Sequence, residues 1–509
     1  MIPWPRSAPT ARDRERYADS HLGSFWLDPA SGVPVAPRLD PLDADATTDL
    51  LVVGGGYTGL WAALHAKADD PDRDVLLLEA GRCGHAASGR NGGFCVASLT
   101  HGVEHGHARY PEELPELERL GLGNHAGLLD DLRRMGIDAE VEETGQIGIA
   151  LDPRDTDWIE EGAALLRDLG HDVLTLDAEA ARAEIASPVV HGGLWDRTGA
   201  ALVHPGRLAV GLRAAALDAG VRIHERTTVT ALRATGRGVR ATVAGDRSPA
   251  GRTAPGTPPV GGSTVGVPAL NGPTVTARRV VLAAGAHLGG AGSPDLAPTV
   301  RRRIAPVWDH ALVTEPLTPE QRDRIGWRNR QGMSDVANLF HYFRLTADDR
   351  ILWGGYDAVW RRGGSTDDRH QDHDPTYARL AQHFAVAFPQ LDDVRFTHRW
   401  GGAIDTSGRF AAFFGTTHDG RVAHAVGYTG LGVAATRFGA RVALDLVDGH
   451  DAIATRSRFV GTRPLPFPPE PVRTAAIRVV QRRMLAADRR GRRGPFLRLL
   501  DRMGLGLDS

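Results

Sequence analysis

A glycine-rich turn near the start of the chain has the spacing of a nucleotide-binding loop. Residues 54–59 read Gly-Gly-Gly-Tyr-Thr-Gly, which fits the pattern G-x-G-x-x-G. The first glycine allows a sharp turn, the second lets backbone N–H groups approach a pyrophosphate, and the third lets the next helix pack closely. Glu79 stands 20 residues after Gly59, where a carboxylate accepts hydrogen bonds from ribose hydroxyls. The pattern predicts binding of a dinucleotide.

Glycine clusters also form ordinary tight turns, so the elements around this turn decide its meaning. Residues 49–53 form a short apolar run, which is typical of a strand buried in a parallel sheet. Apolar residues from Leu60 onward recur at helical spacing, and residues 75–78 form a second apolar run that ends at Glu79. This order favours a dinucleotide-binding unit, although a glycine-rich turn in another doubly wound fold stays open.

Three further groups of small residues stand where a flat cofactor needs close contact with the backbone. Residues 86–93, Ala-Ala-Ser-Gly-Arg-Asn-Gly-Gly, follow the second strand and are small enough to lie against a ring. Residues 283–285, Ala-Ala-Gly, close a later strand. Residues 430–432, Gly-Leu-Gly, begin the last predicted helix of the domain, where free N–H groups can meet the electron-rich edge of a flavin.

The composition is that of a soluble globular protein, with 42% hydrophobic and 24% charged residues. A net charge of -2 gives no overall attraction to nucleic acid. Cys83 and Cys95 are too few for a disulfide framework, and we find neither a secretory signal nor an apolar run that spans a bilayer. His101, His105 and His107 lack the carboxylates or cysteines that would complete a metal site. We expect a cytoplasmic protein without metal, nucleic acid or integral membrane association.

The length of 509 residues favours more than one structural domain. We predict an α/β fold, in which a Rossmann-like nucleotide-binding domain is discontinuous in sequence and carries an inserted α+β substrate domain with an antiparallel sheet. The predicted parts are an N-terminal arm (1–45), the nucleotide-binding domain (46–105, 190–300 and 406–460, with a disordered insert at 247–273), the substrate domain (106–189 and 301–405) and a basic helical C-terminal tail (461–509).

Four sequence motifs together resemble one known family. They are Gly-Gly-Gly-Tyr-Thr-Gly-Leu-Trp (54–61), Leu-Glu-Ala (78–80), Ser-Gly-Arg-Asn-Gly-Gly (88–93) and Gly-Tyr-Thr-Gly-Leu-Gly (427–432). The set resembles the FAD-dependent oxidoreductases related to D-amino-acid oxidase, glycine oxidase and sarcosine oxidase, especially their gamma-glutamylputrescine oxidase-like branch. The insert and the basic tail fall outside this resemblance.

The resemblance implies FAD as the cofactor. The first glycine turn and Glu79 would hold its ADP half, residues 88–93 would line the pyrophosphate and ring, and residues 430–433 would face the pyrimidine edge. Val229 would lie near the adenine. The expected cofactor-binding residues are Gly54, Gly56, Tyr57, Thr58, Gly59, Glu79, Ala80, Ser88, Gly89, Arg90, Asn91, Gly92, Gly93, Val229, Gly285, Gly430, Leu431, Gly432 and Val433.

The family uses its flavin for the chemistry, so the protein positions the substrate and excludes water. Residues 340–345 alternate like a strand, which puts Tyr342 and its neighbours on one face and His341 on the other. In relatives similar to sarcosine oxidase, this strand places a polar aromatic side chain over the flavin, and the alignment brings His341 there. We therefore expect His341 to be catalytic, unless it only completes a hydrogen bond of the sheet.

The chain departs from its amino-acid-oxidising relatives at the substrate clamp. Those relatives carry an arginine four positions after a tryptophan, whereas Trp400 is followed at that distance by Ile404. An aliphatic side chain cannot pair with a carboxylate, but the adjacent Asp405 suits a cationic amine. We take Asp405, Trp400 and Tyr342 as candidate substrate-binding residues. A turn role for Asp405, and a core role for the aromatic side chains rather than a box around a cation, stay open.

The residues available for electron transfer to oxygen also differ from those of the sarcosine oxidase-like relatives, which use a lysine near flavin N5. Lys67 is the only lysine, and it lies in the first helix. The acceptor is therefore oxygen reached by another route, or an unknown acceptor. The cysteine that tethers the flavin in some relatives aligns near Trp400, so we expect non-covalent FAD, with a link through His85 left open.

The resemblance thus predicts an enzyme, either oxidase or dehydrogenase, that moves a hydride to flavin N5 from the carbon beside an amine nitrogen. The substrate would be a polyamine-like compound, an N-acyl diamine or a secondary amine, and the imine would then be hydrolysed. Two alternatives stay open. One is a dehydrogenase of an amino acid or hydroxy acid that uses His341 or His310 as a base. The other is a flavin-binding subunit for electron transfer or sensing.

Overall fold

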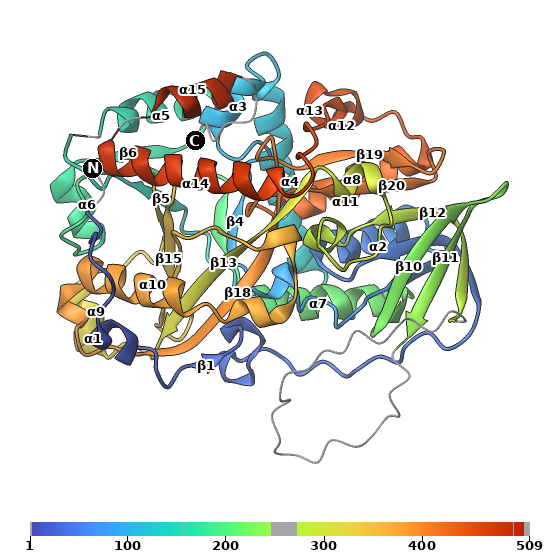
Figure 1. The fold of residues 1–509 in the computed structure, drawn as a ribbon, viewed down its shortest axis with the longest axis horizontal. Helices are drawn as coiled ribbons and strands as arrows, with labels where there is room; N and C mark the ends of the chain where they lie inside the picture. Colours follow the sequence, from blue (N-terminus) through green and yellow to red (C-terminus); the bar gives the residue numbers. More distant parts are fainter. Residues whose placement is uncertain (1–2, 155, 246–271, 492, 503–509) are drawn as a thin grey trace.

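Two large sheets, one of 10 and one of eight strands, form the frame of the protein in the computed structural model (Figure 1). The structure describes residues 3–154, 156–245, 272–491 and 493–502. Apart from residues 272 and 273, the insert predicted at 247–273 lies outside the described residues. The predicted α/β fold is confirmed, whereas the predicted domain boundaries stay a prediction.

The eight-stranded sheet is built around parallel strands, and the central parts of these strands are apolar. β2 (Ala46–Val53) lies between β3 (Val75–Leu78) and β12 (Thr274–Leu282), and β9 (Arg222–His224) extends the sheet beside β3. Every residue of β3 is buried, as expected of a strand covered on both faces. The remaining strands of this sheet are β10 (Thr227–Ala234), β11 (Val239–Gly245), β19 (Phe413–Thr417) and β20 (Val422–Val426).

Three helices cover one face of this sheet and share a single core with it. They are α2 (Tyr57–Asp69), which follows the glycine turn, α7 (Pro205–Asp218) and α11 (Ala435–Asp448). Because β2, α2 and β3 follow one another and the two strands are parallel, the chain forms the predicted strand, turn, helix, strand unit. β20 and α11 return from the far end of the chain to the same sheet, so this domain is discontinuous.

The 10-stranded sheet is mostly antiparallel and lies beside the first. Its centre is the long pair β13 (Ile304–Thr314) and β18 (Phe396–Ser407), followed by β16 (Ile351–Gly355) and β15 (His341–Leu345). The other strands of this sheet are β1 (His21–Leu22), β5 (Gln146–Ile149), β6 (Val173–Leu176), β7 (Gly193–Asp196), β14 (Gly332–Asp335) and β17 (Val359–Trp360). A separate small sheet consists of β4 (Phe94–Val96) and β8 (Ala200–Leu202).

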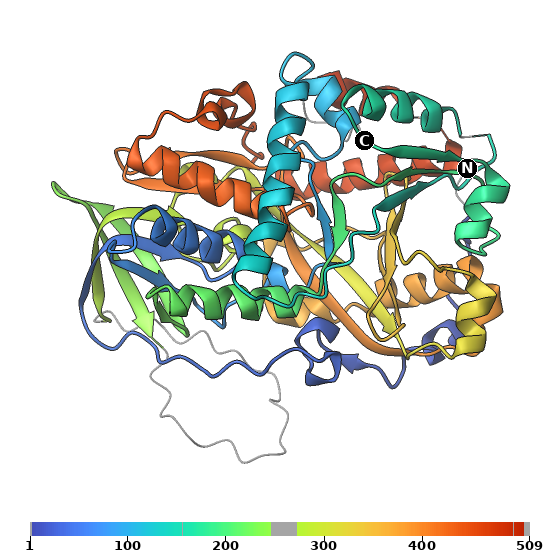
Figure 2. The same cartoon turned by 180° about the vertical axis from the view of Figure 1, so that it is seen from behind.

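The remaining helices surround this frame, and α4 stands at the boundary between its two halves when the molecule is seen from behind (Figure 2). They are α1 (Ala11–Glu15), α3 (Val103–Arg109), α4 (Leu114–Arg134), α5 (Asp157–Asp168), α6 (Ala178–Glu184), α8 (Pro298–Arg301), α9 (Pro319–Ile325), α10 (Asp374–Ala387), α12 (Ile453–Arg456), α13 (Arg458–Gly461), α14 (Val472–Arg490) and α15 (Pro495–Arg502). Within the described ranges, no helix combines the length and apolarity needed to cross a bilayer.

A buried ion pair fixes the arm to the first domain. Arg213 of α7 and Glu225, which follows β9, lie 3.2 Å apart, with side-chain exposures of 4% and 2%. Glu225 also accepts hydrogen bonds from the backbone N–H groups of Leu39 (3.2 Å) and Cys83 (3.0 Å). Arg213 donates in addition to the carbonyl of Pro37 at 2.6 Å. The pair therefore holds three separate segments together.

Removing one partner of this pair should cost far more stability than removing a partner of an exposed pair. We expect Glu225→Ala to lower the free energy of unfolding by about 3 to 5 kcal/mol, because it leaves a buried guanidinium without its carboxylate. The control is Asp74→Ala, which breaks the exposed pair with Arg222 and should cost about 1 kcal/mol or less. Thermal and urea unfolding measure both, and equal losses would contradict the prediction.

Candidate active site

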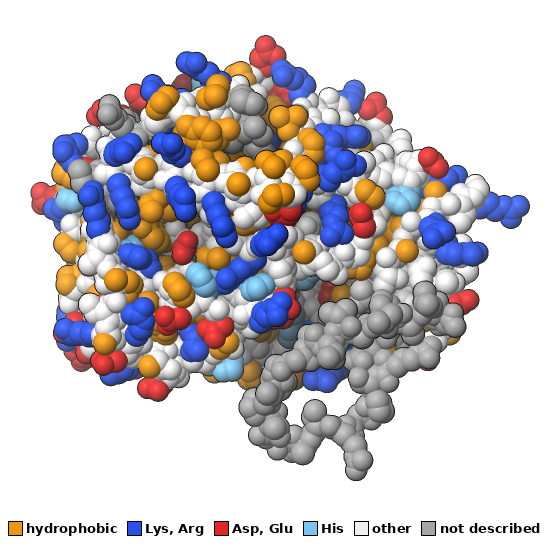
Figure 3. Space-filling view, viewed as in Figure 1, with side chains coloured by type: hydrophobic (Ala, Val, Ile, Leu, Met, Phe, Trp, Pro, Cys, Tyr) orange, Lys and Arg blue, Asp and Glu red, His pale blue; other side chains and the backbone are white. Residues whose placement is uncertain are grey.

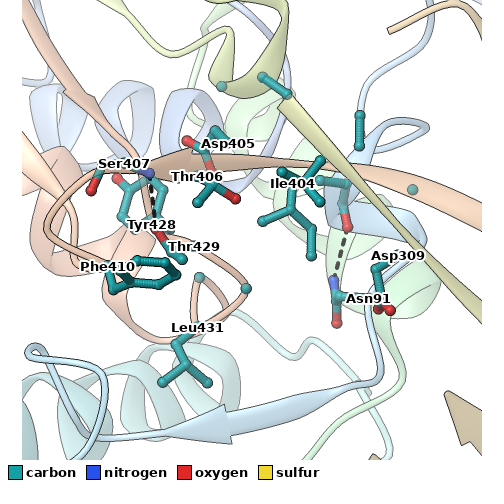
Figure 4. Close-up of a pocket in the computed structure, with 18 of the residues that line it drawn as sticks. Asn91, Asp309, Ile404, Asp405, Thr406, Ser407, Phe410, Tyr428, Thr429 and Leu431 are labelled. Carbon is teal, nitrogen blue, oxygen red and sulfur yellow. Dashed lines mark hydrogen bonds between the residues drawn. The ribbon is translucent and has the colours of Figure 1, made fainter. Parts of the chain in front are cut away.

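One continuous cavity of about 1810 Å³ lies between the two sheets and brings together motifs that are far apart in the sequence. Its walls include the first glycine turn, the loop after β3, the end of β12, the face formed by β13, β15 and β18, and the turn before α11. Figure 4 shows part of this wall, where Ile404, Asp405 and Thr406 follow one another along β18 and Asn91 and Asp309 lie beside Ile404.

The first glycine turn has space only for glycine at its two ends. Gly54 has a φ of 107°, and a Cβ there would stand 2.7 Å from the carbonyl oxygen of Ala283. A Cβ at Gly59 would overlap the carbonyl oxygen of Gly54, so Gly59 lets α2 pack against the turn. Ser88 braces the turn from the neighbouring loop, because its Oγ accepts a hydrogen bond of 2.9 Å from the N–H of Tyr57.

Glu79 fixes this turn through both of its carboxylate oxygens. Oε2 accepts the N–H of Gly55 and Oε1 accepts the N–H of Gly81, each at 2.7 Å. Burial raises the pKa of Glu79, and the two backbone hydrogen bonds oppose that shift. Val229, on β10, borders the same end of the cavity. A cradle of bare backbone that ends at a carboxylate fits the ADP half of FAD.

Most of the predicted cofactor-binding residues border the cavity. Three glycines do not, because they pack against other backbone: Gly59 on the turn, Gly89 on Gly84 and Gly93 on Val203. The predicted residues that do border it are Gly54, Gly56, Tyr57, Thr58, Glu79, Ala80, Ser88, Arg90, Asn91, Gly92, Val229, Gly285, Gly430, Leu431, Gly432 and Val433.

The loop of residues 88–93 is held in place by indole groups from two other parts of the chain. Trp26 of the arm donates to the carbonyl of Asn91 at 2.8 Å, and Trp400 of β18 donates to the carbonyl of Arg90 at 2.9 Å. Trp400 borders the cavity but is only 1% exposed. Its contact thus makes Trp400 a positioning residue for the loop.

A carboxylate and a phenol form the polar centre of the substrate sheet. The hydroxyl of Tyr342 donates to Oδ2 of Asp309 at 2.6 Å, and both side chains border the cavity. Removal from bulk water raises the pKa of Asp309 to about 6, although the hydrogen bond from Tyr342 opposes the shift. Burial and the carboxylate raise the pKa of Tyr342 well above its usual value. The phenol therefore stays protonated and donates.

Tyr342 reaches Asp309 because two glycines leave room for its ring. A Cβ at Gly354, the β16 neighbour of Tyr342, would stand 2.6 Å from the phenol oxygen. A Cβ at Gly92 would stand 2.7 Å from Cε2 of the same ring. The ring thus passes over β16 and lies against the loop expected to face the flavin. Asp309 was not among the residues predicted from the sequence, although a single carboxylate within the apolar run 304–314 was a usable signal.

Asp405 borders the cavity as predicted, but one of its oxygens is already engaged. Oδ2 accepts the N–H of Gly427 at 2.6 Å, which ties β18 to the turn before α11. Burial raises the pKa of Asp405 to about 6, and backbone hydrogen bonds oppose this. The neighbouring Ile404 also borders the cavity. Asp405 therefore ties β18 to the turn that begins at Gly427. It lies within β18 and not in a turn before Thr406, which was the alternative role left open for it, and its role in substrate binding stays a prediction.

The geometry corrects the prediction that His341 lies over the flavin. His341 is fully buried and does not border the cavity. Its Nδ1 lies 2.9 Å from Oδ2 of Asp335, and its Nε2 lies 3.0 Å from Nδ1 of His383, on the α10 side of the sheet. Alternation along β15 gives the cavity face to Tyr342 instead. The predicted alternation is correct, but the aligned residue is displaced by one position.

The structure also shows where three other candidate residues, Lys67, His310 and His85, lie relative to the cavity. Lys67 donates to the carbonyls of Pro71 and Arg73 on the outside of α2, away from the cavity. His310 is 1% exposed, and burial lowers its pKa to about 3, which makes it a poor base. His85 borders the cavity, and burial lowers its pKa to about 4. In the described part of the chain, no cluster of His, Cys, Asp or Glu could hold a metal ion.

Comparison with known proteins gives consistent matches over most of the chain. Residues 49–446 match the family described as FAD dependent oxidoreductase (DAO). The gamma-glutamylputrescine oxidoreductase of Escherichia coli (strain K12) is 30% identical over 457 residues, which are 88% of this chain and 93% of that protein. A probable oxidoreductase of Haemophilus influenzae is 26% identical over 447 residues, 85% of this chain and 89% of that protein.

Solved structures show the same fold. Glycine oxidase from Geobacillus kaustophilus superposes with a TM-score of 0.64 at 20% identity, over 82% of this chain and 100% of that one. L-proline dehydrogenase from P. horikoshii superposes with a TM-score of 0.61 at 14% identity, over 80% of this chain and 95% of that one. At these identities the likeness concerns the arrangement of the chain alone.

The steric argument for the first glycine turn predicts a loss of flavin on a single substitution. We expect Gly59→Ala to retain less than about a tenth of the wild-type FAD, because the new methyl group pushes α2 away from the turn. Gly123→Ala is the matched control, since nothing lies within 4 Å of a Cβ there. Flavin absorbance per protein after gel filtration measures both. Full flavin content in Gly59→Ala would refute the predicted fit.

Proposed function

Because the chain belongs to the DAO family of FAD-dependent oxidoreductases, we propose that it oxidises an amine. The proposed substrate is a polyamine-like compound, an N-acylated diamine or a secondary amine. When bound, FAD supplies the acceptor for the hydride of the C–H bond beside the nitrogen. The substrate leaves as an imine, which water hydrolyses to a carbonyl compound and an amine or ammonia.

The observation that carries this proposal is the Asp309–Tyr342 pair, which borders the cavity next to Gly92. A carboxylate kept from bulk water gains most from a cation, because the cation replaces the lost solvation. An ammonium group bound at Asp309 would stand beside the loop expected to face the flavin. Tyr342 would hold the carboxylate in position by its hydrogen bond.

The same pair suits the proton movement that amine oxidation needs. A hydride leaves readily only from a neutral amine, because the lone pair of nitrogen stabilises the positive charge that develops. The raised pKa of Asp309, about 6, is nearer to that of an amine than the pKa of an exposed carboxylate. It thus reduces the cost of moving the ammonium proton to the carboxylate of Asp309.

The basic side chains of the cavity do not favour an α-amino acid or a hydroxy acid. Among the described residues that border it, Arg82, Arg90 and Arg473 carry positive charge, and each donates to protein carbonyls or carboxylates. His171 also borders the cavity, and although burial lowers its pKa, its pairs with Asp196 and Glu118 raise that pKa to about 9, so its charge is already matched. None of these four side chains belongs to the β13, β15 or β18 wall, where Ile404 stands. A substrate carboxylate would therefore meet Asp309 without a compensating clamp.

The E. coli relative supports the same substrate class. Its name specifies gamma-glutamylputrescine, which is a diamine acylated on one nitrogen. At 30% identity the likeness favours an amine of this kind without fixing its acyl group. We also propose that FAD is held without a covalent bond, because Cys83 and Cys95 are buried free thiols and neither is an expected ring contact.

The direct test is anaerobic bleaching of the flavin absorbance by a panel of polyamines, N-acyl diamines, N-methylated amines, amino acids and hydroxy acids. We expect bleaching by members of the first three groups and recovery in air if oxygen is the acceptor. Bleaching by hydroxy acids alone would replace the proposal by the alternative dehydrogenase. FAD that no compound bleaches would favour a subunit for electron transfer or sensing.

Substitution of Asp309 and of Asp405 shows which of these two cavity carboxylates binds the amine. We expect Asp309→Asn to lower kcat/KM for the best amine at least about 30-fold, because the ammonium loses its charged partner. Asp405→Asn should lower kcat/KM less, because its oxygen can still accept the N–H of Gly427. Steady-state kinetics at equal FAD content measures the difference. If Asp405→Asn causes the larger loss, Asp405 is the amine partner.

The hydrogen bond from Tyr342 predicts a shift in pH dependence. In the wild type, kcat/KM should rise as pH increases through about 6, because Asp309 must be ionised to bind the ammonium. The phenol stabilises the ionised form, so Tyr342→Phe should move this rise to higher pH. Profiles of kcat/KM from pH 5 to 9 measure the shift, and an unchanged or lower midpoint would contradict it.

A further inference from the structure

The C-terminal tail borders the cavity although it lies beyond the family match, which ends at residue 446. In Figure 1, α14 crosses the near face of the molecule above the strands β13 and β15. The residues of α14 that border the cavity form a stripe at helical spacing, in which the apolar side chains of Ala476, Ile477, Val480 and Met484 are joined by Arg473 and Gln481. Leu500 of α15 borders it as well.

Specific hydrogen bonds fix this helix over the substrate sheet. Asp488 is buried, and its carboxylate accepts the N–H groups of Asn338 at 2.9 Å and Leu339 at 3.1 Å. The indole of Trp360 donates to the hydroxyl of Thr474 at 3.0 Å. The loop between β14 and β15 and the strand β17 are thus tied to opposite ends of α14. These hydrogen bonds hold α14 in one position beside the cavity.

The stripe on α14 continues an apolar path that begins at the Asp309–Tyr342 pair. The ring of Phe340 lies 6.4 Å from that of Tyr342, and Phe340 is 42% exposed and borders the cavity. Beyond it, Leu339 packs with Val480, Met484 and Leu500 in one apolar cluster. If one end of a molecule is bound at Asp309, the part that extends toward the tail therefore contacts these apolar side chains.

The outer face of α14 has the opposite character. Arg478, Arg482, Arg483 and Arg490 are exposed, and Figure 3 shows basic side chains in a row along the surface where Figure 1 places this helix. The charged groups keep the outer face in water, while the apolar stripe borders the cavity with Met484 buried and Ile477 and Val480 half-buried. The amphipathic pattern of the tail thus sets which side of α14 faces the substrate.

We propose that α14 and α15 form the outer wall of the substrate-binding lobe and select amines by the size of their apolar part. This rests on the proposed function: the nitrogen binds at Asp309, and the chain beyond it lies along Phe340, Leu339 and Val480. Each methylene that reaches this wall adds about fourfold to the specificity constant. The preferred substrates are therefore amines with an extended aliphatic or aromatic substituent.

Neighbouring positions on α14 provide a matched pair of variants. Val480 borders the cavity, whereas Val479 is 42% exposed on the other side of the helix. We expect Val480→Trp to lower kcat/KM for the longest members of a series of alkylamines and N-acyl diamines at least tenfold relative to the shortest. Val479→Trp should leave this ratio unchanged. A uniform loss over all lengths in Val480→Trp would overturn the proposal.

A second measurement does not depend on turnover. Quenching of the flavin fluorescence by acrylamide reports how well the wall shields the cavity. We expect Asp488→Ala, and to a smaller extent Asp488→Asn, to raise the quenching constant at least twofold at unchanged FAD content, with Val479→Trp equal to the wild type.

The two measurements separate the two proposals. If no amine bleaches the flavin but Asp488→Ala still opens the cavity to acrylamide, the proposed function fails and the selection of amines fails with it, while the wall itself stands. If amines are oxidised but neither the length ratio nor the quenching changes, the wall is refuted and the proposed function remains.

Discussion

Backbone carbonyls of the loop at residues 88–93 accept hydrogen bonds from two indole groups, one on the arm and one on the substrate sheet. The same loop braces the first glycine turn through Ser88 and leaves a space at Gly92 that the ring of Tyr342 fills. The loop therefore sets the distance between the nucleotide turn and the polar centre of the substrate sheet. Because three of its six residues are glycine, the backbone can approach both sides closely.

The chemistry available at this centre follows from a carboxylate that is partly removed from water. Asp309 borders the cavity beside a phenol, and a carboxylate in this position favours a cation. Ile404 stands on the neighbouring strand, where it offers no partner to an anion. The tail then adds an apolar wall farther from the centre. In the function proposed above, charge at one end and apolar surface at the other would discriminate among amines in two independent ways.

Two candidate residues illustrate the limits of reasoning along a single strand. Alternation in β15 assigned His341 and Tyr342 correctly to opposite faces, but it could not state which face meets the cavity. The packing of α10 decided this, since it provides His383 as a buried partner for His341. Asp405 shows the same limit, because only the fold brings the N–H of Gly427 to its carboxylate.

The sequence by itself determined the family, the FAD-binding turn and the two kinds of sheet, because these depend on local spacing. Gly54 and Gly59 must be glycine for steric reasons that hold within a few residues, and alternation or continuity of apolar residues distinguishes the sheets. Only the tertiary structure placed Asp309 beside Tyr342 and the tail over the cavity. Those contacts join segments far apart in the chain, and their geometry depends on how the two sheets pack together.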